Sequence, residues 1–295
     1  MIKYPKVFIV VLNHNGKATV QKCLAGVFKL GYPNFEVVFV DNDSDDGSLE
    51  LAKTNFSKAN FIKNAENLGC AVGKNIGIRF SLERMADYVL LLNSDVEVDK
   101  DFLSRLIDAA GNDGSAGLFS PIIFENGTKQ ILFSGGKIDW LKMRLVYAKK
   151  IQTEDLYGTE FVTGHSMLVK AEVFKKIGLF DEDFFLHWGD VDFSFRAGKA
   201  GFKKMMVSAS WAYRFEKNEK EEGRDVYWKI ISGLIFFKKN IKIWMKPWVG
   251  GRVWLGKMKN WLDIRFRRNE ADLMAQRAYR DLKSVEFQGN NGRMR

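Results

Sequence analysis

The sequence predicts an α/β fold in which a mixed, mostly parallel sheet carries helices on both of its faces. Two observations support this prediction. Apolar runs of strand length alternate with amphipathic segments of helix length over residues 1–115, which is the pattern of strand–helix–strand units. Several of these runs end abruptly in polar residues, and ligands of open α/β sheets bind beyond the carboxyl ends of the strands.

The first half of the chain supplies the alternating pattern. We expect strands over residues 7–12, 35–40, 60–63 and 88–92, and helices over residues 17–30, after Ser48 and up to Met85. The apolar run 88–92 is too short for a helix and is typical of a strand that is buried on both faces. A glycine-rich stretch, residues 67–77, opens the last of these helices.

Polar side chains follow three of the predicted strands. Asn13 follows the first, Asp41 the second, and Asn93 and Asp95 the fourth. Because the carboxyl ends of parallel strands share one edge, we expect these side chains to converge there. A carboxylate at this edge suits a divalent cation with oxygen ligands. The alternative is that residues 93–95 are only a turn and a helix cap.

From Ala116 the pattern changes to shorter strands. We expect strands over residues 120–124, 131–134, 145–148 and 161–169, and helices over residues 171–177 and 191–200. Residues 184–192 between the two helices combine aromatic and acidic side chains, and Asp190 stands directly before the second helix. An isolated acid in that position is often an N-cap, so the sequence leaves that alternative open.

The last part of the chain is basic and rich in tryptophan. The net charge is +10, and between Lys229 and Arg268 the only acid is Asp263. We expect a helical region over residues 215–295, with disorder from residue 288 onward. Such a region would lie on an anionic membrane surface, or would pack as a helical hairpin on the preceding domain or on the second subunit of a homodimer.

Several classes of function are disfavoured. The basic charge would suit nucleic acid, but no helix-turn-helix, zinc-binding or RNA-binding signature occurs, so we expect no nucleic-acid partner. No apolar run reaches the length that spans a bilayer, and no secretory signal is visible. The two cysteines, Cys23 and Cys70, lack metal or redox spacing. We therefore expect a cytoplasmic protein, attached peripherally to the inner face of the cell membrane if the tail binds lipid.

Five short motifs occur in a characteristic order. They are Val10–Gly16, Val40–Ser48, Asn67–Ile78, Leu91–Asp95 and Asp190–Arg196. Each is weak alone, but together they resemble the glycosyltransferase family 2 enzymes, especially their bacterial rhamnosyltransferase-like branch. The resemblance implies a Rossmann-like GT-A fold over residues 1–214, with a nucleotide-sugar-binding half at 1–115 and an acceptor-binding half at 116–214.

The resemblance also implies roles for residues in the first half. Asp41 would hydrogen-bond the nucleobase or ribose of a sugar nucleotide, and Asn13 and Asp46 would shape that pocket. Lys74 and Asn75 would lie near the nucleotide, where the lysine balances diphosphate charge.

Further roles fall on the family's metal motif and on the acidic cluster. Asn93 and Asp95 match the metal motif, whose last acid would bind Mg²⁺ or Mn²⁺ bridging the diphosphate. Asp190 matches the acid that would act as general base. Trp188 beside it would stack on a sugar ring.

The implied reaction is an inverting sugar transfer. A UDP- or dTDP-sugar would donate to a hydroxyl of a saccharide or lipid-linked saccharide during cell-surface polysaccharide synthesis. Two positions depart from the family pattern, since Gly189 stands where a glutamate is usual and Tyr213 stands near a usual histidine. The alternative is therefore a non-catalytic or weakly active homologue that binds nucleotide sugar or glycan.

Overall fold

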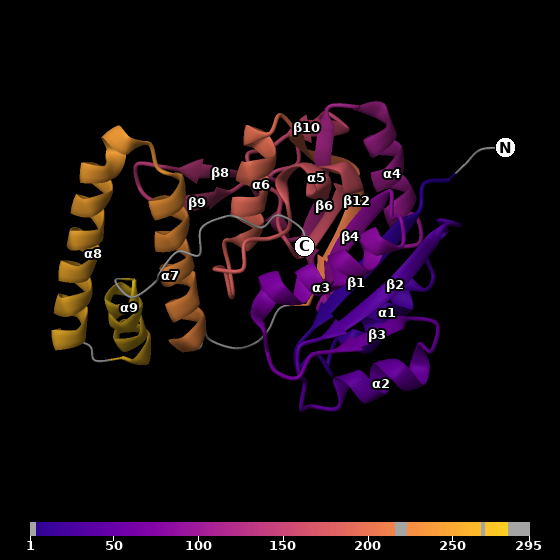
Figure 1. The fold of residues 1–295 in the computed structure, drawn as a ribbon, viewed down its shortest axis with the longest axis horizontal. Coiled ribbons are helices and arrows are strands. Elements are labelled where there is room, and N and C mark those ends of the chain that lie inside the picture. Colours follow the sequence, from indigo (N-terminus) through magenta and orange to yellow (C-terminus); the bar gives the residue numbers. More distant parts are fainter. Residues whose placement is uncertain (1–3, 216–222, 267–268, 283–295) are drawn as a thin grey trace.

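The computed structural model describes residues 4–215, 223–266 and 269–282, and a large mixed sheet forms its centre (Figure 1). The strands of this sheet are β1 (Val7–Asn13), β2 (Phe35–Asp41), β3 (Asn60–Lys63), β4 (Tyr88–Asn93), β5 (Val96–Val98), β6 (Ala116–Glu125), β7 (Ile131–Phe133), β10 (Leu156–Gly158), β11 (Ser166–Lys170) and β12 (Lys203–Arg214). Their order is β10-β12-β6-β11-β4-β1-β2-β3, with β5 paired to β12 and β7 to β6. A separate hairpin joins β8 (Gly136–Asp139) and β9 (Arg144–Tyr147).

The helices complete the predicted α/β architecture. They are α1 (Val20–Val27), α2 (Ser48–Asn55), α3 (Gly69–Glu83), α4 (Phe102–Asn112), α5 (Ala171–Ile177), α6 (Gly189–Lys199), α7 (Gly223–Asn240), α8 (Lys246–Phe266) and α9 (Glu270–Asp281), with a short 3-10 turn, η1 (Ile243–Met245). Strands β3, β2, β1 and β4 pair in parallel, whereas β11 runs antiparallel to β4 and β6. The mixed, mostly parallel sheet is confirmed.

Strand β1 lies at the centre of the core. All of its residues are buried, so both faces of the sheet are covered there, as expected for a parallel strand. Helix α3 approaches one face very closely, because a Cβ atom on Gly77 would lie 2.3 Å from Cγ1 of Val10. The glycine-rich sequence of this helix therefore serves close packing as well as the loop before it.

The C-terminal helices α7, α8 and α9 lie beside the sheet domain, at the left of Figure 1. Helix α7 packs on that domain through the buried side chains of Ile231, Ile235, Phe236 and Phe237. None of the helices in the described ranges is long and apolar enough to cross a membrane. The disorder expected from residue 288 onward falls outside the described residues.

Several elements differ from the sequence prediction. The longest strand, β12, was not predicted, and neither were β5, β8 and β10. Strand β12 mixes polar with apolar residues and pairs with the distant β6, so no local signal marks it. Strand β11 begins only at Ser166, because residues 161–165 bend toward α6 instead. Helix α1 begins at Val20 rather than at residue 17, since the backbone N–H of Lys17 donates to Asp46.

Candidate active site

The carboxyl ends of β1, β2 and β4 meet at one edge of the sheet. Asn13 is the register partner of Asp41, and Leu12 is the partner of Asn93. The polar residues that the sequence predicted to converge therefore do lie side by side. Parallel pairing produces this arrangement directly, because each strand stops at the same level.

Asp41 organises the loop that follows β2. Its side chain is fully buried, and Oδ1 accepts hydrogen bonds from Asn13 Nδ2 at 2.9 Å and from Ser44 Oγ at 2.6 Å. Oδ2 accepts from the backbone N–H of Ser44 at 2.9 Å. About four lone-pair sites exist on a carboxylate, so most are already used by the chain. This geometry favours a role in shaping the pocket over the expected direct contact with a base or ribose.

Asp46 fixes the other end of the same loop. Its carboxylate accepts from the backbone N–H groups of Lys17 at 2.8 Å and Ser48 at 2.9 Å. Burial opposes ionisation, but these hydrogen bonds outweigh it and hold the pKa of Asp46 below its ordinary value. Asp46 thus ties the start of α2 to the loop after β1, which agrees with the pocket-shaping role expected for it.

Buried oxygens without partners mark the same edge. Within the described residues, Asn13 Oδ1, Asn93 Oδ1 and Asp95 Oδ1 are buried and accept no hydrogen bond. Such atoms are uncommon in native folds, and an ion or ligand is a usual explanation. Carboxylate and amide oxygens are also the atoms that Mg²⁺ and Mn²⁺ prefer, so this donor set fits a divalent cation.

The protein offers few ligands to such a cation. The described part of the chain holds no cluster of three or more His, Cys, Asp or Glu side chains that could enclose a metal. A cation at Asp95 would therefore take most of its ligands from phosphates and water, as Mg²⁺ does in many nucleotide sites. The other oxygen of Asp95, Oδ2, accepts from Nε of Arg214 at 3.1 Å.

A chain of hydrogen bonds connects Lys74 to Asp190. Lys74 is only 6% exposed, and its Nζ donates to the carbonyl of Gly164 at 2.7 Å. The N–H of Gly164 donates to Oδ2 of Asp190, also at 2.7 Å. A Cβ atom on Gly164 would lie 2.6 Å from that lysine nitrogen, so a side chain here would separate the two groups. Sequence reasoning missed Gly164 because nothing local distinguishes it.

Asp190 lies in the first turn of α6 and is held there on both sides. Besides the bond to Gly164, its Oδ1 accepts from the backbone N–H of Val191 at 2.9 Å. The two residues before Gly189, His187 and Trp188, both have φ of 60°. Left-handed backbone at consecutive non-glycine residues costs free energy and clusters at functional sites. The N-cap alternative is wrong, because Trp188 occupies the cap position.

Helix α7 stabilises this strained turn. Trp188 is 8% exposed, and its ring packs against Phe236 and Phe237 of α7 at centroid distances of 5.2 and 5.4 Å. His187 Nε2 lies 2.8 Å from Oδ1 of Asp225 on the same helix. The expectation that Trp188 stacks on a sugar is therefore wrong in this structure, since α7 covers its ring. The C-terminal region instead helps to position Asp190.

Asn75 also has a different role from the expected one. Its side chain is fully buried and exchanges two hydrogen bonds with the backbone of Phe180, at 2.9 and 3.0 Å, and a third with Glu182. These contacts join α3 to the loop before Asp190. Asn75 therefore links α3 to the segment before α6 rather than offering an open nucleotide contact.

Two further residues at this site, His165 and Arg214, have no functional role predicted from the sequence, in which His165 reads as structural. His165 Nδ1 lies 2.7 Å from Thr163 Oγ1, and burial together with the nearby charges of Arg214 and Lys74 holds the pKa of His165 well below its usual value. The imidazole is therefore neutral at pH 7. Arg214 is the second residue. The ring of its neighbour Tyr213 stacks on Phe124, with centroids 5.9 Å apart. Because neighbouring strand residues point to opposite faces, Arg214 points the other way, toward Asp95.

The family model described as Glycosyl transferase family 2 matches residues 8–178, more than half of the 295-residue chain. The chain belongs to this family. This family 2 chain is accordingly a glycosyltransferase, and the resemblance drawn from its motifs is confirmed.

Curated relatives are about one-quarter identical to this glycosyltransferase over the residues that align. It is 26% identical over 226 residues to an N-acetylglucosaminyl-diphospho-decaprenol L-rhamnosyltransferase of Mycobacterium tuberculosis, covering 68% of the chain and 73% of the relative. It is 24% identical over 191 residues to the dTDP-rhamnosyl transferase RfbF of Shigella flexneri, covering 64% of the chain and 62% of the relative. Relatives named for succinoglycan and amylovoran biosynthesis also match.

Solved structures establish the GT-A fold. GalNAc-T7 with UDP, GalNAc and Mn²⁺ superposes with a TM-score of 0.67 at 16% identity, over 96% of this chain and 58% of that one. The mannosyltransferase PcManGT from Pyrobaculum calidifontis, in complex with GDP-Man and Mn²⁺, gives 0.61 at 16% identity, over 97% and 77%. The chain thus spans little more than half the length of the GalNAc-T7 chain.

Proposed function

We propose that this glycosyltransferase moves a sugar, with inversion, from a nucleoside-diphosphate sugar to a hydroxyl of a saccharide or lipid-linked saccharide. The observation that carries the proposal is the juxtaposition at the sheet edge. Asp95 has an unpartnered carboxylate oxygen, Oδ1, at the end of β4. Lys74 connects to Asp190 through the backbone of one residue, Gly164, and the carbonyl of the next residue, His165, accepts from the N–H of Asn93 at this edge.

The proposed mechanism requires that the charge of the leaving diphosphate is stabilised. Breaking the sugar–diphosphate bond builds negative charge on the diphosphate, and fixed positive charge lowers that barrier. Lys74 carries three N–H donors, of which the Gly164 carbonyl takes one, so others remain for a phosphate oxygen. Asp95 would hold Mg²⁺ or Mn²⁺, which would supply further neutralisation without proton transfer.

The mechanism also requires that the acceptor hydroxyl is deprotonated. This hydroxyl must lose a proton as it attacks the anomeric carbon, and Asp190 is the carboxylate that we assign as general base. The strained turn at residues 187–188 and the bond from the Gly164 N–H fix the direction of this carboxylate. A single displacement on the face opposite the leaving diphosphate inverts the anomeric centre.

One departure from the family pattern favours the alternative of a weakly active homologue. Gly189 provides no carboxylate, and the space beside it would admit a side chain, because a Cβ atom would lie 3.4 Å from Cβ of Phe184. Packing therefore does not require glycine here. Since Asp190 is retained and held by two hydrogen bonds, we favour the enzyme.

The names of two relatives support a class of donor and a class of acceptor. One is named as a dTDP-rhamnosyl transferase, which supports a dTDP-sugar donor, and the other as an N-acetylglucosaminyl-diphospho-decaprenol L-rhamnosyltransferase, which supports a lipid-linked acceptor. Thermal unfolding with UDP, dTDP, GDP and their sugars, followed by product mass analysis, tests the proposal. We expect one nucleotide class to raise Tm, more with Mn²⁺ than with EDTA, and its sugar to be transferred. No Tm rise with any of them would contradict the proposal.

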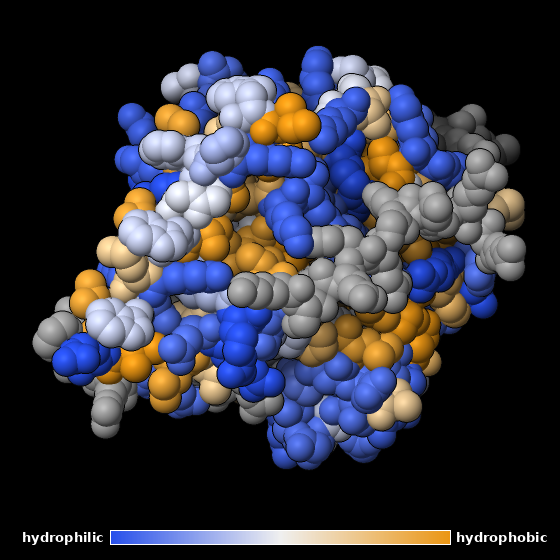
Figure 2. Space-filling model, turned by 60° about the vertical axis from the view of Figure 1, so that its left-hand side comes forward, coloured by the Kyte–Doolittle hydropathy of each residue, from blue (hydrophilic) through white to orange (hydrophobic). Residues whose placement is uncertain are grey.

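A lipid-linked acceptor would require the enzyme to reach the membrane, and α8 supplies a suitable surface. Its outward side carries two rows of exposed apolar side chains at helical spacing. They are Trp248, Leu255 and Leu262 in one row, and Trp254, Met258 and Trp261 in the other, all between 42% and 60% exposed. The exposed basic residues Arg252 and Lys259 belong to the same stretch of the helix. Figure 2, which turns the side of the molecule with the C-terminal helices forward, shows hydrophilic and hydrophobic residues next to one another there. We propose that this face rests on anionic lipid at the inner side of the cell membrane.

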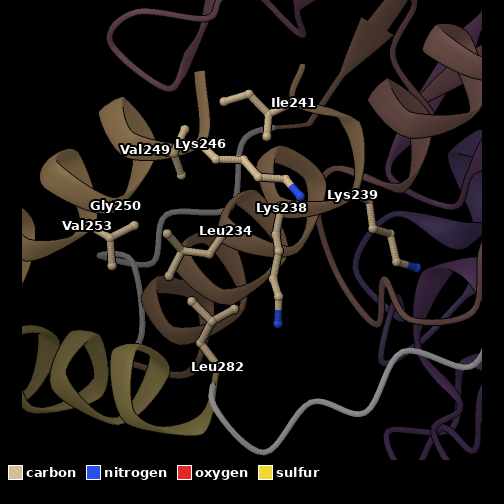
Figure 3. Close-up of a pocket in the computed structure, with 9 residues that line it drawn as sticks. All are labelled: Leu234, Lys238, Lys239, Ile241, Lys246, Val249, Gly250, Val253 and Leu282. Carbon is tan, nitrogen blue, oxygen red and sulfur yellow. The ribbon is translucent and has the colours of Figure 1, made fainter. Parts of the chain in front are cut away.

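The opposite side of α8 faces the other helices. Between α7 and α8 lies a cavity of about 500 Å³, lined by aliphatic side chains and by the stems of lysines (Figure 3). Its lining includes Leu234, Val249 and Val253 and no residue of the sheet edge, so it is separate from the site at Asp95. Helix α8 touches the domain where Trp248 and Arg252 donate to the carbonyls of Leu141 and Lys142, at 3.0 and 3.3 Å. Packing on the domain and contact with a membrane are nevertheless compatible, because the apolar side chains from Trp254 to Leu262 stay exposed.

Vesicle binding tests the membrane proposal. The double variant W254A/W261A should bind vesicles of phosphatidylglycerol and phosphatidylcholine on the order of tenfold more weakly, because two interfacial rings are lost. The matched control is Trp211→Ala, which removes a 41% exposed tryptophan from β12. High salt should weaken binding of the unaltered protein. Equal sedimentation of all three proteins with vesicles would contradict the proposal.

A further inference from the structure

Arg214 is a cation at the proposed metal site that neither the motifs nor the named relatives account for. Its Nε donates to Oδ2 of Asp95 at 3.1 Å, and this carboxylate is the proposed metal ligand. The backbone fixes the pair as well, because the N–H of Phe215 donates to the carbonyl of Asp95 at 2.9 Å and Arg214 is in register with Val96 of β5. The guanidinium is therefore held beside Asp95 by two strands.

Only part of the guanidinium is used by this contact. The side chain of Arg214 is 34% exposed, whereas that of Asp95 is 14% exposed, so the arginine reaches further toward solvent. Among the residues that the structure describes, its two terminal Nη groups have no hydrogen-bond partner. The paired N–H donors of a guanidinium, its fork, have the spacing to bind two oxygens of a phosphate.

A second cation points to the same place. Nζ of Lys74 donates to the carbonyl of Gly164 at 2.7 Å, and the carbonyl of the next residue, His165, accepts from the N–H of Asn93 at 3.0 Å. Asn93 stands two residues before Asp95, the partner of Arg214, so both cations lie close to the end of β4. A diphosphate there would meet positive charge from both side chains.

From this geometry we infer that Arg214 binds the donor diphosphate directly and supplies positive charge that would otherwise have to come from the metal. The inference rests on the proposed function, because it concerns the same diphosphate. Asp95 then serves two cations, with Oδ2 on Arg214 and Oδ1 open to the metal. Nucleotide binding should accordingly survive metal removal in part, and the surviving part should depend on Arg214.

Calorimetric titration of UDP, dTDP and GDP, each with Mn²⁺ and with EDTA, tests this inference. The unaltered protein should bind its nucleotide in EDTA, and Arg214→Ala should weaken that binding on the order of tenfold to a hundredfold, as expected for the loss of a charge-assisted pair. Arg214→Lys keeps the charge without the fork and should fall in between. Arg214→His adds a possible metal ligand, so its affinity should rise more steeply with Mn²⁺ than that of the unaltered protein.

The control is Arg105→Ala, which breaks a comparable pair with Asp99, also at 3.1 Å and 36% exposed, on α4. It should leave nucleotide affinity unchanged, and circular dichroism should show that all variants are folded. If Arg214→Ala and the unaltered protein bind nucleotide equally in EDTA, Arg214 does not contact the diphosphate and the inference falls while the proposed function stands. If the unaltered protein binds none of the nucleotides in either condition, the proposed function falls as well.

Discussion

Replacing Asp190 by asparagine is expected to abolish most sugar transfer and to leave nucleotide binding in place. The substitution keeps the shape of the side chain but removes the group that accepts the proton of the acceptor hydroxyl. General-base catalysis typically contributes about 10²- to 10⁴-fold, so kcat should fall by a factor in that range. Initial-rate measurements with the identified donor, beside calorimetric titration of its nucleoside diphosphate, check both parts.

A control separates catalysis from stability. Both oxygens of Asp190 accept backbone N–H groups, so the amide introduced by Asp190→Asn would face one of these donors and cost about 1–3 kcal/mol of stability. The control variant is Glu172→Gln, which removes an acid from the first turn of another helix, α5. Its stability and activity show what the loss of a negative charge at a helix start does by itself. Equal activities of Asp190→Asn and the unaltered enzyme would show that Asp190 is structural only.

Replacing Asp95 by alanine is expected to remove the part of nucleotide binding that depends on metal. The unpartnered Oδ1 of Asp95 is the only carboxylate oxygen with that property among the residues described at the sheet edge. The rise in Tm that a nucleoside diphosphate produces with Mn²⁺ should therefore drop to the value measured with EDTA. Transfer should fall on the order of 10²-fold or more, as for other losses of transition-state charge stabilisation.

The matched control for this variant is Asp99→Ala. Asp99 also pairs with an arginine, Arg105, but lies three residues before α4 and is more exposed than Asp95. Its variant should keep the full difference between Mn²⁺ and EDTA. A persistent Mn²⁺ effect in Asp95→Ala would mean that the metal is bound elsewhere.

The sheet edge could be predicted because its signals are local. Each of the strands β1, β2 and β4 is an apolar run that stops at a polar residue, and parallel pairing then aligns Asn13, Asp41 and Asn93. Asp190 could also be predicted, because an acid among aromatic residues before a helix is visible in the sequence. These features need only neighbouring residues to be recognised.

The remaining features depend on contacts between distant segments. Arg214 reaches Asp95 because β12 pairs with β5 and β6, which lie far earlier in the chain. The sequence around Trp188 is typical of a ring that stacks on a sugar. In the structure, Phe236 and Phe237, which come much later in the chain, cover that ring. Asn75 was expected at the nucleotide, but its amide matches the backbone of Phe180. No pattern of residue types within one segment contains this information.

The most direct measurement is the anomalous diffraction of a crystal grown with Mn²⁺ and the nucleoside diphosphate that raises Tm. The account predicts an Mn²⁺ peak at coordination distance from Asp95 Oδ1, with the diphosphate between the side chains of Lys74 and Arg214 and within reach of Asp190. A diphosphate bound away from the ends of β1, β2 and β4, for instance among the lysines between α7 and α8, would contradict it.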